Sequence, residues 1–161
     1  MIHVRAKVVR NLNNAVVRHC NVSVLPRLIV VAGVIEKQGY YFIAQRLESA
    51  SQGGLWEFPR GKVEVDETPA QALERELREE LSIGTTTGVW LADSVFDYGD
   101  KIVELKGYLS HWQQGEIQLN SHQQMAWVSL SQLDNYCFCA ADYPIITALH
   151  NHMAQMSNAK G

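Results

Sequence analysis

The most continuous apolar segment of the chain lies at residues 28–35, where several residues are β-branched. Such a run is typical of a strand buried on both faces. Residues 37–39, Lys-Gln-Gly, form a turn signal, so residues 40–45 are predicted to be the antiparallel partner of a hairpin. Other apolar runs predict strands at residues 55–58, 89–95, 102–109 and 125–128.

The pattern changes to a helical period after Thr68. Thr68 is a typical helix cap, Pro69 suits the first helical position, and Gln71 completes a capping box. Apolar residues then recur three and four positions apart, which predicts one buried stripe on the helix. These residues are Ala70, Leu73, Leu77 and Leu81.

Two more helices are predicted towards the C-terminus. Ser129 and Gln132 resemble a second capping box, which opens a brief helix. Asp142 is expected to cap a last helix from Tyr143 to about Met156. Strands and helices mix without regular alternation, so we expect a mixed sheet with helices packed on it.

Composition places the chain among globular proteins. It has 161 residues, of which 47 % are hydrophobic, and this favours one domain with a sizeable core. The longest apolar run is too short for a membrane-spanning helix. Three cysteines, Cys20, Cys137 and Cys139, do not form a disulfide framework and fit a reducing, cytoplasmic compartment. No second pair follows Cys137 and Cys139 at zinc-site spacing, so buried thiols are expected there.

The net charge of −3 hides an uneven distribution. Residues 1–27 hold five bases and no acid, which leaves nine bases against 17 acids in residues 28–161. The basic segment is interpreted as an N-terminal arm or as sequence upstream of the domain, with an additional strand as the alternative. We expect the domain to span residues 28–156, with a tail at 157–161. The weak net charge argues against a general nucleic-acid or membrane-surface binder.

Seven acids gather in residues 61–83. On a helix, Glu76, Glu79 and Glu80 share one side, at the border of the apolar stripe. Like charges at this spacing are unfavourable, and so are acids near a helix C-terminus. A hard divalent cation would offset both costs, because it needs converging carboxylate oxygens. The alternative is a solvated face with Arg75 and Arg78 as partners.

The same segment resembles the Nudix box, G-x5-E-x7-R-E-U-x-E-E-x-G-U, where U is aliphatic. Its fixed positions are occupied here by Gly61, Glu67, Arg75, Glu76, Leu77, Glu79, Glu80, Leu81 and Ile83, and only the second glycine differs, as Ser82. The preceding residues 55–62 and several later segments look like the MutT-like subgroup, and within it the CTP pyrophosphohydrolase branch. The resemblance covers about residues 28–150. It implies the Nudix fold, an α/β/α sandwich with a mixed β-sheet between helices.

The resemblance also implies an activity. MutT-like members are Mg²⁺-dependent pyrophosphohydrolases that release a nucleoside monophosphate and pyrophosphate, and Mn²⁺ is a possible substitute. By position, the metal ligands would be Glu76, Glu79, Glu80 and the backbone of Gly61. Arg75 would orient a box glutamate by pairing with Glu67. Lys62 would neutralise phosphate charge, whereas Arg46, Phe58 and Asp142 would recognise the base.

Asp142 has two open interpretations, base recognition and helix capping, and both can hold together. An ionised Asp142 accepts hydrogen bonds only, and so suits an exocyclic amine such as cytosine N4 or the guanine N1–H and N2 edge.

Three positions depart from the family pattern. Residues 120–124 hold no acid where a further metal-site glutamate is expected, so the general base is a box glutamate or is assisted by His122. Arg60 replaces a glycine, and either reaches phosphate or disturbs the turn that presents Gly61. Ser82 is the milder departure, since Gly84 follows.

The expected function is nucleotide-pool sanitising, with oxidised or modified dNTPs, or CTP and dCTP, as substrates. The alternatives are a Nudix hydrolase of dinucleoside polyphosphates or nucleotide sugars, and a non-catalytic nucleotide-binding domain. A small-molecule nucleotide is the expected partner, with no stable nucleic acid and no membrane, in a monomer or homodimer.

Overall fold

The computed structural model describes residues 2–10 and 16–160, and side chains from residue 24 onwards. A mixed sheet forms its centre, with strands in the order β5-β4-β3-β8-β7 and with β6 and β9 paired to β3 and β4. The strands are β3 (Arg27–Lys37), β4 (Tyr40–Arg46), β5 (Trp56–Glu57), β6 (Arg60–Lys62), β7 (Ile83–Asp97), β8 (Ile102–Gly115) and β9 (His122–Ser129). β3 pairs with β8 in parallel, and the other pairings are antiparallel.

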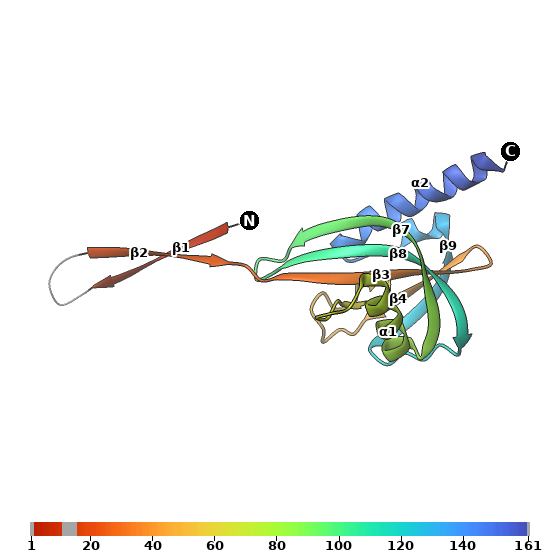
Figure 1. Ribbon diagram of the computed structural model, residues 1–161, viewed down its shortest axis with the longest axis horizontal. Helices are drawn as coiled ribbons and strands as arrows, with labels where there is room; N and C mark the ends of the chain where they lie inside the picture. The colour runs from red at the N-terminus through yellow and green to blue at the C-terminus, as the bar shows by residue number, and fades with distance from the viewer. Residues whose placement is uncertain (1, 11–15, 161) are drawn as a thin grey trace.

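The two faces of this sheet explain the continuous apolar run of β3. Val30, Ala32 and Val34 pack into a core cluster with helix α2 (Tyr143–Ala159), whereas Val31 and Ile35 pack into a second cluster with helix α1 (Pro69–Leu81). Alternate residues of a strand point to opposite faces, so a strand covered on both sides is apolar throughout. Figure 1 shows α1 and α2 on opposite sides of the sheet. The predicted α/β/α sandwich is confirmed.

Helix α1 begins as the sequence predicts. Thr68 is its cap, the Thr68 hydroxyl accepts from the Gln71 N–H, and the Gln71 side chain accepts from the Thr68 N–H. The stripe residues Leu73, Leu77 and Leu81 are completely buried. The helix ends at Ser82, which adopts the left-handed conformation at φ 60°. Gly84 lies inside β7 and does not end the helix. The expectation that Gly84 would compensate for the serine at position 82 is therefore wrong.

Several boundaries differ from the predictions. β7 begins at Ile83 and β8 runs to Gly115, so this hairpin is longer than expected because its outer half carries polar residues on an exposed face. The brief helix after Ser129 is a 3₁₀-helix, η1 (Leu130–Asn135), and a second one, η2 (Ala140–Asp142), precedes α2. α2 continues to Ala159, past the expected start of the tail at residue 157. Cys139 is buried as predicted, but Cys137 is exposed.

The basic N-terminal segment contains two strands, β1 (Ile2–Arg10) and β2 (Val16–Val24), which pair antiparallel in a sheet of their own. Figure 1 shows this hairpin beyond the end of the main sheet where β3 begins. Strand structure was the alternative that the sequence disfavoured, and Arg27 belongs to β3 rather than to the arm. Within the described part of the chain, no helix is long and apolar enough to cross a bilayer.

Candidate active site

Gly61 is held between the sheet and α1. β6 pairs with the middle of β3, with Gly61 opposite Val31, and this places its backbone against the Glu76 side chain. A Cβ on residue 61 would lie only 1.8 Å from Cδ of Glu76. Glycine is therefore required at this position by a close approach, and Glu76 lies directly beside the Gly61 backbone.

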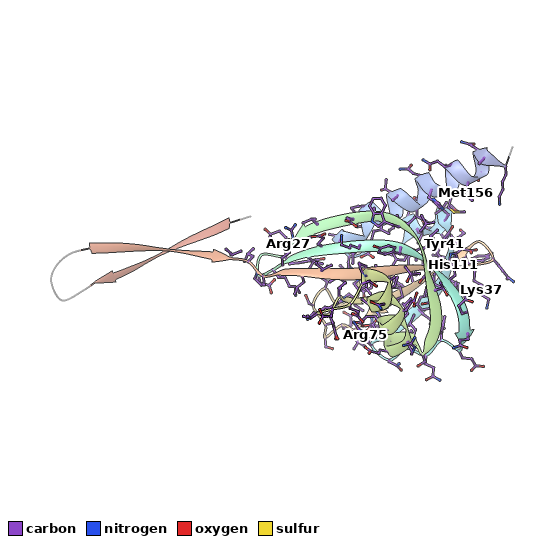
Figure 2. All side chains as sticks on the ribbon, viewed as in Figure 1. Arg27, Lys37, Tyr41, Arg75, His111 and Met156 are labelled. Atoms are coloured by element: carbon purple, nitrogen blue, oxygen red, sulfur yellow. The ribbon has the colours of Figure 1, made fainter. Side chains whose placement is uncertain are left out.

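Arg75 lies on α1 (Figure 2), and its hydrogen bonds connect the loop that precedes the helix to the helix itself. Its Nε donates to Oε1 of Glu67 at 2.7 Å, and its Nη2 donates to Oε2 of Glu67 at 2.9 Å and to the Lys62 carbonyl at 3.0 Å. Its Nη1 donates to Glu76 at 2.9 Å and more weakly to Glu79 at 3.4 Å. The pairing with Glu67 that the resemblance implies is therefore present, and these hydrogen bonds lower the pKa of Glu67 to about 2.

Glu80 occupies a different environment from Glu79. The Glu79 side chain is 60 % exposed, whereas Glu80 is half-buried. Burial raises the pKa of Glu80 to about 7, the negative charges of Glu57 and Glu76 add to this, and His122 opposes it. The three box glutamates thus differ in exposure, although Arg75 contacts both Glu76 and Glu79 and the charge of Glu76 acts on Glu80. In the described residues, no three acidic, histidine or cysteine side chains already converge as metal ligands, which differs from the expected shared ligand set.

The donors present nevertheless fit a hard divalent cation. Glu76 lies against the Gly61 backbone, and Glu80 is a half-buried carboxylate next to the negative charges of Glu57 and Glu76. Carboxylate and carbonyl oxygens are the ligands that Mg²⁺ prefers, and a cation among crowded carboxylates relieves their repulsion. Glu76, Glu80 and Gly61 are consequently the residues best placed to hold such an ion, with Glu79 at the exposed side.

Glu57, in β5, connects side chains of β4, β6 and β9. Its carboxylate accepts from Arg46 Nη1 at 2.9 Å and lies 2.9 Å from Nε2 of His122 and 3.1 Å from Nε of Arg60. Glu57 is only 3 % exposed; although burial raises its pKa, the neighbouring cations and hydrogen bonds prevail and lower it to about 2. Sequence reasoning missed this residue. The available signal was a single acid between Trp56 and Phe58 in an otherwise apolar segment.

The other predicted base-recognition residues lie deeper than expected. Phe58 is fully buried, with its ring 5.6 Å from that of Phe138, so no surface of Phe58 is open to a base. Asp142 is also fully buried and pairs with Arg60. Asp142 is the N-cap residue of α2, as expected, but its side chain makes no capping hydrogen bond and accepts instead from the Phe58 N–H at 3.1 Å. The capping interpretation is therefore correct for the position of Asp142 and wrong for its side chain.

A cavity of about 220 Å³ opens beside these residues. Its apolar lining includes Leu28, Val30, Tyr98 and Val103. Its charged lining consists of Arg46, Glu57, Arg60, Lys62 and Lys101. The box residue Gly61 also lines the cavity. A smaller cavity of about 170 Å³ is lined by Glu80 and His122 and shares Arg46 and Glu57 with the first. The structure thus places an apolar and cationic cavity next to the box carboxylates.

Comparison with known proteins identifies the class to which this fold and site belong. Residues 30–148 match the family model described as "NUDIX domain". The chain therefore belongs to the Nudix family of hydrolases. It is 40 % identical over 119 residues to the CTP pyrophosphohydrolase of Escherichia coli (strain K12), covering 74 % of this chain and 88 % of that protein.

Two further relatives agree with this assignment. The chain is 37 % identical over 123 residues to the 8-oxo-dGTP diphosphatase of Haemophilus influenzae, covering 76 % of this chain and 90 % of that one. The solution structure of the E. coli ORF135 protein matches with a TM-score of 0.72 and 38 % identity, over 81 % of this chain and 94 % of that one.

Proposed function

We propose that this protein is a Mg²⁺-dependent nucleoside triphosphate pyrophosphohydrolase that releases a nucleoside monophosphate and pyrophosphate and acts in nucleotide-pool sanitising. The observation that carries the proposal is the contact of Glu76 with both Arg75 and the Gly61 backbone, beside a cavity lined by cations. The names of two relatives, CTP pyrophosphohydrolase and 8-oxo-dGTP diphosphatase, support a nucleoside triphosphate as substrate.

The cation that fits this site would neutralise the triphosphate, position it and lower the pKa of the attacking water. In the proposal, Glu76, Glu79, Glu80 and the backbone of Gly61 hold that ion, and Mn²⁺ is its possible substitute. Arg75 fixes Glu76 and joins it to Glu67, so the loop and the helix keep one geometry. A network of this kind reduces the reorganisation needed when substrate binds.

The cavity would hold the nucleoside and its phosphates. Its apolar side, with Leu28 and Val103, suits a base, and aromatic contact is available from Tyr98. Lys62 lies next to Gly61 and supplies positive charge where the phosphates would approach the ion. Arg46 borders both cavities, so it lies between the nucleoside and the carboxylates.

A substrate panel with product identification tests the proposal. The protein is incubated in Mg²⁺ with normal and oxidised dNTPs, CTP, a dinucleoside polyphosphate and a nucleotide sugar. The expected result is pyrophosphate and nucleoside monophosphate from a triphosphate. Orthophosphate release, turnover confined to the dinucleotide or the sugar, or binding without turnover would contradict the proposal. A cytoplasmic location, a monomer or homodimer and the absence of a stable nucleic-acid partner remain part of the same proposal.

A further inference from the structure

The Arg60 side chain lies between Asp142 and the cavity, so Arg60 rather than Asp142 lines the cavity wall. The Arg60 side chain is 14 % exposed and lines the cavity of about 220 Å³, whereas Asp142 is completely buried behind it. Nη2 of Arg60 donates to Oδ2 of Asp142, and the other Asp142 oxygen accepts from the Phe58 N–H at 3.1 Å. Both oxygens of Asp142 are therefore engaged, and a base in the cavity meets the guanidinium instead.

The guanidinium keeps donors for a ligand. Arginine has five N–H donors. Nε is used at the Phe58 carbonyl, 3.3 Å away, and lies 3.1 Å from Glu57, and one Nη2 donor is used at Asp142. Within the described residues, Nη1 of Arg60 donates no hydrogen bond to a protein acceptor. The group at the cavity wall is therefore a donor, in place of the carboxylate acceptor that the sequence predicted.

The other charged groups of the cavity lining also favour hydrogen-bond donors over acceptors. Glu57 is the one carboxylate among the described lining residues, and it already pairs with Arg46 and His122 as well as with Arg60. The remaining ionic residues are cations, and the neutral side chains of Ser51 and Gln52 can donate or accept. The cavity consequently offers more donors than acceptors.

Phosphate is a poorer partner for Arg60 than a neutral oxygen. The guanidinium lies between the carboxylates of Glu57 and Asp142, so its positive charge is already compensated locally. Lys62 follows Gly61 in sequence and also lines the cavity. Among the described side chains it makes no ion pair, so its charge is available to phosphate. A base carbonyl needs hydrogen-bond donors rather than net charge, and arginine is a common partner of such oxygens.

We infer that Arg60 sets the base preference by donating to a base carbonyl oxygen, with Asp142 as a positioning residue, so that keto bases are preferred to amino bases. This inference rests on the proposed function. An exocyclic amine in the same place would direct N–H groups at the guanidinium and leave both sets of donors unsatisfied. The preference is for a uracil-, thymine- or hypoxanthine-type edge over cytosine or adenine, which differs from the cytosine nucleotide that the name of the E. coli relative gives.

Matched nucleotides test the inference. dUTP and dCTP share a pyrimidine ring, dITP and dATP share a purine ring, and each pair exchanges a carbonyl for an amine. We expect kcat/KM of the wild type to favour the keto member by about tenfold. Arg60→Gln, whose amide both donates and accepts, is expected to bring the ratio to about one. A purely structural effect would lower both rates together and leave the ratio unchanged.

Two further variants keep the test decisive. Asp142→Asn retains the Arg60 contact and is expected to keep the keto preference, whereas direct base recognition by Asp142 predicts a change of preference. Arg60→Gln/Asp142→Asn removes both buried charges and is used if Arg60→Gln alone does not fold; its ratio is also expected near one. Arg78→Gln, on the exposed side of α1, is the control with an unchanged ratio.

A wild-type ratio of one or less, or a ratio that survives removal of Arg60, overturns the inference while leaving the proposed function intact. Calorimetric binding of the non-hydrolysable α,β-imido analogues of dUTP and dCTP gives the same comparison without turnover. Equal affinity for the two analogues contradicts the inference. Failure of both analogues to bind contradicts the inference and the proposed function together.

Discussion

The backbone of Gly61 approaches Glu76 so closely that one additional carbon would lie 1.8 Å from the Glu76 carboxyl carbon. Gly61→Ala must displace Glu76, the loop, or both. We expect kcat/KM for a triphosphate to fall by roughly 100-fold, because displacements of about 1 Å at a site have effects of that size. Titration with Mn²⁺ followed by electron paramagnetic resonance should show weaker binding as well. Unchanged Mn²⁺ affinity in a folded Gly61→Ala variant would show that Gly61 is not part of the metal site.

Arg75 is predicted to act through its forked shape as well as its charge. Lysine cannot reproduce the paired hydrogen bonds to Glu67 while also reaching Glu76. Arg75→Lys is therefore expected to lower kcat about 10- to 100-fold. Arg78→Lys is the matched control, since Arg78 is exposed on the same helix. Equal activity of the two variants would refute the positioning role, and thermal unfolding of both separates activity from stability.

Ser82 occupies a left-handed position that favours glycine. Ser82→Gly removes this strain and is expected to raise the free energy of unfolding by about 1 kcal/mol. Ala154→Gly, at an exposed position inside helix α2, should lower it because glycine is unfavourable there. Urea unfolding measures both. A loss of stability in Ser82→Gly would contradict the strain at this position.

Glu57 should make stability depend on pH. Its pKa is lowered to about 2 in the folded protein, so its contribution is complete above its ordinary pKa near 4.5 and is lost as the pH falls towards 2. Glu57→Gln is expected to lose on the order of 3 kcal/mol of stability at pH 7. The difference from wild type should shrink below pH 4.5.

The pH dependence of wild type must be compared with that of Glu57→Gln, because Asp142 changes stability with pH in the opposite direction. Burial raises the pKa of Asp142. Glu116→Gln, at an exposed position, is the control and should behave as wild type at every pH. Urea unfolding at several pH values between 7 and 3 provides the measurement. A wild-type to Glu57→Gln difference that stays constant over this range would exclude the proposed ionisation of Glu57.

Local signals predicted much of the structure. The capping box of Thr68 and Gln71, and the apolar run of β3, depend on neighbours in sequence or on burial of a whole segment. The pairing of Arg75 with Glu67 was implied by the resemblance to the Nudix box. Such features either involve residues close in sequence or extend over many consecutive residues, so the sequence alone is enough to predict them.

The rest depends on contacts between distant segments. Arg60 and Asp142 are 82 positions apart, and a pattern of types and spacings does not show that one covers the other. Glu57 and His122 are separated by 65 positions and meet only when β4 brings β5 and β9 together. Strand structure in the basic N-terminal segment was considered only as the alternative because its residues have no clear alternation.

The most direct test of the account is triphosphate hydrolysis in Mg²⁺ by wild type, Glu76→Gln and Glu80→Gln, with pyrophosphate as the measured product and Glu116→Gln as control. We expect pyrophosphate release by wild type and control, its loss when Mg²⁺ is chelated, and a decrease of roughly 100-fold or more in each box variant. Full activity in Glu76→Gln and Glu80→Gln, or hydrolysis that persists without a divalent cation, would contradict it.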